Sequence, residues 1–265
     1  MKLLIILGLL LLTPLAWAES ELAFAKTVQN PLATNPETKY NTLPFYNYLN
    51  YGYDADKQTQ YELTLKPVQP FRFTERNDLV LRSIFSFFNQ PSTTGYFNGW
   101  GDFNPTLFIT PKLTDIFIWG VGPTLSVPTA SNKALGSGKW SAGPELCVVY
   151  MPARWVFATL ASNVWSFAGD KSRETVNQLS LQYFISYNFD RGWYLTSQPT
   201  IISNWNMPSS QQWLVPFGGG LGRAFHVGKQ AMNCALLGYY NAISPTQIGP
   251  QWTLEAKIEL LFKDT

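Results

Sequence analysis

The chain has 265 residues, of which 46% are hydrophobic, 15% aromatic and 14% charged, and its formal net charge is +2. So small a basic excess cannot neutralise a run of phosphates, and we expect no nucleic-acid partner. A single His and two Cys cannot assemble the common zinc sites, so we expect no metal ion and no cofactor.

The first residues carry the pattern of an export signal. Lys2 gives a cationic start, residues 3–12 form an apolar run, and Ala16 and Ala18 are the small residues that a signal peptidase reads. The run is too short to span a bilayer as a helix. We therefore predict a signal peptide over residues 1–18 and an exported mature chain.

Residues 19–39 follow the predicted cleavage site. They contain Gln29-Asn30-Pro31 and Asn35-Pro36, which is too irregular for a strand. On the topology predicted below, this segment lies on the periplasmic side. Two interpretations stay open: a plug that enters the lumen of a barrel, and a loose tail.

Residues 40–265 consist of segments in which apolar and polar side chains alternate. In residues 177–189, Leu179, Leu181 and Ile185 share one face, while Gln178 and Gln182 share the other. This period of two predicts strands. Twelve such segments are predicted: 41–52, 59–70, 78–88, 102–111, 116–127, 140–150, 155–166, 176–188, 193–204, 213–225, 230–241 and 252–262.

The connections between these segments alternate in length. Short ones follow the even segments, whereas long ones rich in Pro, Gly, Ser and Asn, such as residues 89–101, follow the odd ones. An up-and-down barrel with short periplasmic turns and long external loops has this pattern. We predict an all-β fold: a closed antiparallel transmembrane β-barrel of about 12 strands in the bacterial outer membrane. A secreted soluble sandwich is the alternative.

Aromatic residues gather at the predicted strand ends, where a ring can sit at the level of the lipid headgroups. Phe262, near the end of the last strand, resembles the terminal aromatic signal by which barrels are assembled. We therefore expect membrane lipid, lipopolysaccharide and the barrel-assembly machinery as partners. The predicted interface residues are Trp140, Trp155, Trp165, Trp193, Trp205, Trp213 and Trp252.

Alternation also predicts which polar residues face the lumen. Both charge signs occur among them, which favours ion-paired networks over an ion-selective ring. These side chains either contact a solute or chiefly satisfy one another. The predicted lumen residues are Glu62, Lys66, Arg82, Asp102, Glu145, Gln178, Gln182, Gln198, Arg223, Glu255, Lys257 and Glu259.

Arg223 ends the glycine-rich run that begins at Gly218. No helix and no Lys-Ser/Thr pair follow the run, so it is not a phosphate-binding loop. It indicates a strand where the wall bends or where a neighbouring segment comes close. Cys147 and Cys234 lie in separate strands, and we predict two unpaired thiols.

Several stretches resemble a known family. These are WGVGPTLSVPTA (119–130), LGSGKWSAGP (135–144), NVWSFAGD (163–170), GWYLTSQP (192–199) and VPFGGGLGRAF (215–225). They are similar to bacterial outer-membrane proteins described as phenol meta-pathway-like transporters, a group often mislabelled as neuromedin U. The resemblance implies an outer-membrane barrel that passes small compounds, aromatic or hydrophobic ones among them.

We therefore expect a channel for the passive uptake of small molecules, including hydrophobic or aromatic ones. The alternative is a structural or surface-interaction barrel with a filled interior and no transport. We expect no enzyme, because the only His, His226, falls in a predicted short turn on the periplasmic side.

Overall fold

The computed structural model describes residues 25–27, 29, 40–53, 57–92, 95–111, 116–245 and 249–263. The predicted signal peptide (1–18) and most of the segment 19–39 lie outside these ranges. No helix within the described ranges is long and apolar enough to cross a membrane.

The described chain is built from antiparallel strands. Their bounds are β1 Tyr40–Tyr53, β2 Gln58–Leu65, β3 Val68–Arg72, β4 Asn77–Ser92, β5 Gly95–Trp100, β6 Asn104–Pro111, β7 Phe117–Ser126, β8 Lys139–Tyr150, β9 Trp155–Gly169, β10 Asn177–Asn188, β11 Trp193–Ser197, β12 Thr200–Asn204, β13 Trp213–Val227, β14 Gln230–Ile243 and β15 Trp252–Lys263.

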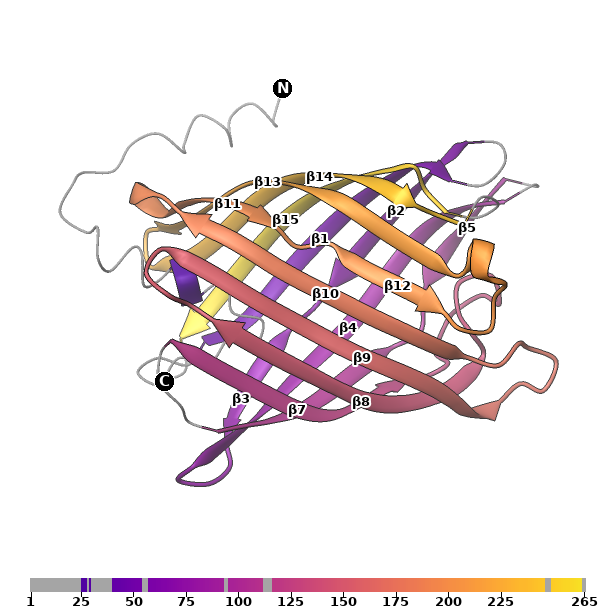
Figure 1. Cartoon of the computed structure of the whole chain (residues 1–265), viewed down its shortest axis with the longest axis horizontal. Helices are drawn as coiled ribbons and strands as arrows, with labels where there is room; N and C mark the ends of the chain where they lie inside the picture. Colours follow the sequence, from indigo (N-terminus) through magenta and orange to yellow (C-terminus); the bar gives the residue numbers. More distant parts are fainter. Residues whose placement is uncertain are drawn as a thin grey trace.

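These strands form one closed barrel. Three of its wall strands are each interrupted once, which divides them into β2 and β3, β5 and β6, and β11 and β12. The described segments therefore make a barrel of twelve wall strands, in which β1 pairs with β15 and β9 with β10. Figure 1 shows the strands strongly tilted against the long axis. The predicted closed 12-stranded barrel is confirmed.

The two ends of the barrel differ. At one, which we call the turn end, short connections such as Met151–Arg154 join the strands. At the other, the loop end, β7 connects to β8 through residues 127–138, and β12 to β13 through residues 205–212. The predicted loop 89–101 is wrong, because β4 continues to Ser92 and pairs with β5, so that the hairpin extends the wall.

Side-chain burial shows that the barrel is inverted relative to a soluble protein. Large apolar residues at alternate positions are exposed on the outside, among them Leu146, Phe157, Leu195, Phe217 and Ile258. An exposed apolar belt is stable in hydrocarbon, where a closed barrel also leaves no unpaired sheet edge. The exterior is therefore suited to a bilayer.

Inside, the turn end is packed with apolar side chains, which the alternation did not predict. Val80 on β4, Phe108 on β6, Val149 on β8 and Val156 on β9 are fully buried there and belong to one cluster. These strands are apolar on both faces near their turn ends. The barrel thus has a hydrophobic core at one end, and the polar lumen occupies the remainder.

A glycine in strand β13 leaves room for the ring of Tyr194 inside the barrel. A Cβ on Gly222 would lie 2.2 Å from the ζ carbon of Tyr194, and Gly222 is paired directly with that residue. Tyr194 is buried and donates a hydrogen bond to Asn233 Oδ1 at 2.6 Å. Glycine is required at position 222 because the tyrosine ring occupies the space of a side chain.

The predicted interface tryptophans lie near strand ends. Trp155 and Trp193 begin β9 and β11 at the turn end, whereas Trp140, Trp205 and Trp252 lie at the loop end. Several form ring pairs: Trp205 with Trp213, and Trp252 with Tyr240. The two cysteines are free thiols; Cys147 is buried and Cys234 is partly buried.

Candidate functional site in the barrel interior

A large cavity lies inside the loop-end half of the barrel. Its volume is about 710 Å³, which is the size of a typical small-molecule site. We call it the vestibule. Its lining is mixed: acids and amides such as Glu62 and Gln178 alternate with apolar and aromatic residues such as Tyr48, Phe88 and Ile202. Loop residues including Pro245 and Pro250 also line it, so it extends to the loop end.

The floor of the vestibule is a layer of charged and amide side chains, which we call the polar belt: Lys66, Arg82, Glu145, Gln182, Gln198 and Glu255. Arg82 Nη1 lies 2.6 Å from Glu145 Oε1, and both side chains are largely buried. Gln198 donates a hydrogen bond to Glu255 Oε1 at 2.7 Å. Burying these charges is tolerable only because each finds a partner.

Lys66 is held differently from the other charges of the belt. Its ammonium donates to Tyr48 Oη at 3.3 Å and lies 4.4 Å from the ring centroid of Tyr46. Both contacts are weaker than a close ion pair. Lys66 is also one of the residues that line both the vestibule and the space beneath it.

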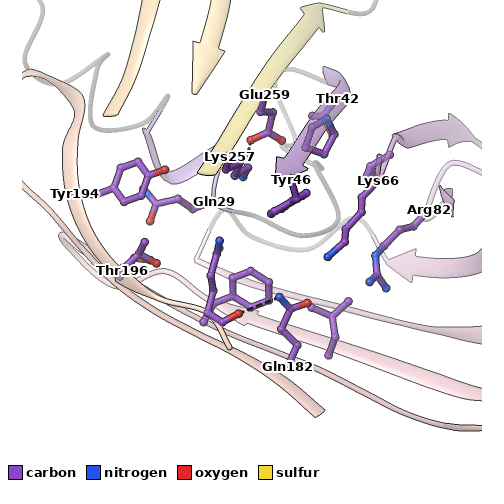
Figure 2. Close-up of a pocket in the computed structure, with 16 residues that line it drawn as sticks. Gln29, Thr42, Tyr46, Lys66, Arg82, Gln182, Tyr194, Thr196, Lys257 and Glu259 are labelled. Atoms are coloured by element: carbon purple, nitrogen blue, oxygen red, sulfur yellow. Dashed lines mark hydrogen bonds and ion pairs between the residues drawn. The ribbon is translucent and has the colours of Figure 1, made fainter. Parts of the chain in front are cut away.

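Beneath the belt a network crosses the barrel. Lys257 Nζ lies 2.7 Å from Glu259 Oε2, which also accepts a hydrogen bond from Asn233. Asn233 in turn accepts from Tyr194. Figure 2 shows Tyr194, Lys257 and Glu259 converging from different walls on one small space. Its volume is about 50 Å³, room for only a few water molecules.

Part of the amino-terminal segment lies inside the barrel at the turn end. Ala25 is fully buried against Ala224, Ala231 and Leu261. Lys26 Nζ donates to the carbonyl of Met151 at 2.7 Å, and Gln29 Nε2 donates to Asn188 Oδ1 at 2.7 Å. In Figure 2, Gln29 points into the small cavity beside Tyr194. Residues 25–27 and 29 therefore lie below the polar belt.

Ten of the twelve predicted lumen residues line the vestibule or the small cavity: Glu62, Lys66, Arg82, Glu145, Gln178, Gln182, Gln198, Glu255, Lys257 and Glu259. Sequence reasoning missed the tyrosines that accompany them. Tyr46 and Tyr48 lie in a segment with aromatics on both faces, which concealed its orientation. Tyr194 could have been found, because alternation places it on the same face as Gln198.

The other two predicted lumen residues lie elsewhere. Asp102 lines neither cavity; it anchors the loop after β7 by accepting hydrogen bonds from Ala130 N (3.2 Å), Ser137 N (2.7 Å) and Ser137 Oγ (2.8 Å). A break in the wall between β5 and β6 places Asp102 beside that loop.

Arg223 lies on the outer face of the wall, so its predicted lumen position is wrong. It pairs directly with Trp193, and the next outward pair along the strands is Leu195 with Leu221, both strongly exposed. Directly opposite residues share a face. The Arg223 guanidinium lies 5.3 Å from the Trp193 ring centroid, and its Nε donates to the carbonyl of Arg191.

Charged groups outside the spanning strands are held by their neighbours. At the turn end, the carboxylate of Asp190 accepts a hydrogen bond from Arg154 and raises the pKa of that guanidinium. In the loop after β9, the hydroxyl and N–H of Ser172 lower the pKa of Asp170. His226 lies in β13 and is exposed, so its predicted turn position is wrong by a short distance.

Comparisons with known proteins agree with the architecture. No protein-family model matches the chain, and no curated protein matches it. Among solved structures, the COG4313 outer membrane channel from Pseudomonas putida F1 is similar, with a TM-score of 0.64, 14% identity and coverage of 84% of this chain and 94% of that one. The NanC porin has a TM-score of 0.53 and 13% identity, covering 84% of this chain and 100% of that one.

The expectation that the chain is not an enzyme has to be corrected. The structural comparison also returns an enzyme, the outer membrane phospholipase of Salmonella typhi, with a TM-score of 0.48, 13% identity and coverage of 91% of this chain and 98% of that one. The position of a single His is not sufficient to exclude catalysis.

Proposed function

We propose that this chain is an outer-membrane channel for the passive uptake of small solutes, hydrophobic and aromatic ones included. The observation that carries the proposal is the vestibule: a cavity of about 710 Å³ that extends to the loop end of a closed barrel. The fold is that of outer-membrane barrels, with channels among its neighbours. A solute from outside would enter at the loops.

The lining of the vestibule favours amphipathic solutes. Phe88, Ile202 and Leu214 offer apolar and aromatic surface, while Gln178 and Gln198 offer amide groups. Small-molecule sites combine such apolar walls with a few polar groups that orient the ligand. The resemblance to phenol meta-pathway-like transporters points to the same class of solute.

The remaining expectations on location fit this proposal. An exported chain with an apolar exterior would meet outer-membrane lipid and lipopolysaccharide, with its tryptophans at the two interfaces. Phe262, exposed at the end of β15, would be available to the barrel-assembly machinery.

A filled, non-transporting barrel is the second candidate. The ion pairs of the polar belt, the apolar core and the buried residues near Ala25 favour it, because together they occupy the turn-end half. The two candidates make different predictions for a solute that enters the vestibule. In a channel the solute crosses the outer membrane, whereas in a filled barrel it can leave only by the way it entered.

A bulky residue in the vestibule should abolish uptake. Ser162 lines the vestibule from β9, so Ser162→Trp would fill part of it with an indole ring. In Gram-negative cells whose own outer membrane excludes N-phenyl-1-naphthylamine, we expect the wild-type protein to raise the rate of dye uptake. Ser162→Trp should return that rate to the level of cells without the protein.

The matched control for this substitution is Ala161→Trp. Ala161 precedes Ser162 on β9 and is paired with Leu146 and Leu181 on the outer face. The same indole ring would there lie against lipid, and uptake should stay at the wild-type rate. Equal uptake in cells with and without the wild-type protein would instead favour the filled barrel.

Displacing the amino-terminal segment should open the turn end. Ala25→Glu would bury a carboxylate among Ala224, Ala231 and Leu261. Burying an unpaired charge there costs more free energy than releasing the segment from the barrel, so we expect the segment to leave. We expect a severalfold rise in single-channel conductance in planar bilayers. Ala25→Ser, which is nearly the same size as alanine, should behave as the wild type; equal conductance of all three proteins would argue against a plug.

A further inference from the structure

Two tyrosine rings form part of the wall where the vestibule meets the small cavity. Tyr46 and Tyr48 lie on the same face of β1, and their rings are stacked, with centroids 6.0 Å apart and an interplanar angle of 5°. Tyr48 lines the vestibule, whereas Tyr46 lines the small cavity beneath it. The face of an aromatic ring is electron-rich and attracts a cation. This part of the wall is therefore suited to a positively charged group.

Two carboxylates flank these rings. In the strand pairing, Tyr48 is directly opposite Glu255 of β15 on one side and Glu62 of β2 on the other. Directly opposite residues share a face of the sheet, and both carboxylates line the vestibule. Glu62 accepts hydrogen bonds from two hydroxyl groups, and Glu255 accepts one from an amide, so all these donors are neutral. We call Tyr46, Tyr48, Glu62 and Glu255 the aromatic box.

The ammonium group of Lys66 lies in the aromatic box. Its Nζ is 4.4 Å from the ring centroid of Tyr46 and 5.7 Å from that of Tyr48, and it donates a hydrogen bond to Tyr48 Oη at 3.3 Å. Figure 2 shows Lys66 beside Tyr46. These are the contacts that a free organic cation makes in an aromatic site. The box thus already contains a cation, which belongs to the chain itself.

The other two cations of the interior are bound in a different way. Arg82 lies 2.6 Å from a carboxylate oxygen of Glu145, and Lys257 lies 2.7 Å from one of Glu259. In the described part of the chain, no such ion pair joins Lys66 to a carboxylate. Its charge is balanced by the ring faces and by the flanking acids at longer range. Lys66 is therefore the interior cation whose place a solute cation could take.

The aromatic box is accessible from the loop end. Glu62, Glu255 and Lys66 line the vestibule, which has a volume of about 710 Å³ and extends to the loops. Lys66 also lines the small cavity, so removing its side chain would leave space between the two. In the wild type, a solute cation that reaches the floor meets the Lys66 ammonium, and like charges at close range repel each other. A neutral solute meets no such repulsion.

We propose that the aromatic box is a site for a small organic cation, and that Lys66 is its built-in occupant, which makes the vestibule select against positively charged solutes. The selection rests on the proposed channel function and specifies the class of solute that the channel rejects. Specific sites often combine an attractive surface with an element that repels the wrong ligand. Here the same side chain fills the attractive surface and supplies the repulsion.

Removing the lysine side chain should convert the box into a binding site. The probe is radiolabelled tetramethylammonium, and its binding to the purified full chain in detergent micelles is measured by equilibrium dialysis. We expect Lys66→Ala to bind it about tenfold more tightly than the wild type, since desolvated cation–π contacts are then available to the probe. Lys66→Arg keeps a cation in the box and should bind as weakly as the wild type. Lys229→Ala removes the same charge from an exposed turn and should also bind weakly.

Further measurements make the result specific to the box. Adding Glu255→Gln to Lys66→Ala should weaken binding severalfold, and neopentyl alcohol, an uncharged molecule of similar shape, should not compete. Where Lys66→Ala lacks the gel band of folded protein, Lys66→Gln takes its place, because its amide can still donate to Tyr48. A folded variant that binds no tetramethylammonium would overturn the proposal. Binding of benzoate by the wild type that is lost in Lys66→Ala would overturn it too, by identifying an anion site.

Uptake by cells tests the selection itself. The wild type should raise the uptake of neutral N-phenyl-1-naphthylamine but not that of ethidium, a permanently cationic aromatic dye, whereas Lys66→Ala should raise both. Equal enhancement of both dyes by the wild type would overturn the selection against cations and leave the channel function standing. If the wild type raises neither dye, the channel function fails, and the dialysis experiment decides on the aromatic box independently.

Discussion

Replacing Arg82 by methionine should destabilise the barrel by about 3–5 kcal/mol, because it leaves a buried carboxylate without its counter-ion. The affected group is Glu145, which lies 2.6 Å from the guanidinium and is otherwise bonded to Thr106 Oγ1. The free energy of unfolding can be measured by urea titration in phospholipid vesicles, with tryptophan fluorescence as the signal.

Two further variants make this result specific. Arg82→Met combined with Glu145→Leu removes both charges, and its stability should return to within about 1 kcal/mol of the wild type, since apolar replacement of a buried pair is often neutral. Arg154→Met breaks the solvent-exposed pair with Asp190 and should change stability little. If the single and double belt variants are equally unstable, the ion pair is not the source of the effect.

Gly222→Ala should also destabilise the barrel, by about 1–3 kcal/mol, because the new methyl group overlaps the buried ring of Tyr194. The ring is held in place by its hydrogen bond to Asn233 Oδ1, which moving the ring away from the methyl group would strain. We expect unfolding in vesicles to reach its midpoint at a lower urea concentration. In gel electrophoresis, the band of folded protein should disappear at a lower heating temperature.

Gly238→Ala on the adjacent strand β14 is the matched control, because its new methyl group would meet no atom within 4 Å. Its stability should be close to that of the wild type. Tyr194→Leu introduced into Gly222→Ala should recover part of the loss, since it removes the overlapping ring. Equal losses in Gly222→Ala and Gly238→Ala would show that backbone entropy, and not the ring, is responsible.

The wall of the barrel could be predicted from the sequence because lipid imposes a strict alternation. In residues 252–262 an apolar residue is followed by Thr253, Glu255, Lys257 or Glu259, and the structure places these four positions in the interior. The strand 102–111 was predicted from the same signal, but its extension to residue 95 was not. Gly95, Gly99 and Gly101 suggested a loop there, whereas pairing with β4 extends the wall.

The interior could be predicted only in part. Alternation identified Arg82 and Glu145 as lumen residues but could not pair them, because they are 63 residues apart. It also failed where both faces of a strand are apolar, as at Val149 and Val156, whose cluster fills the turn end. Arg223 was misplaced because glycines in the run before it remove the side-chain contrast that shows which face is outside.

The hydrophobic core divides the barrel into a tightly packed turn end and a loop end that tolerates more sequence change. Phe108, Val149 and Val156 interlock there as in a water-soluble protein, so changes of volume at these positions are penalised. The vestibule and its loops lie at the opposite end and share little of that packing. New solute preferences could therefore evolve at the loop end without destabilising the hydrophobic core that holds the strands together at the turn end.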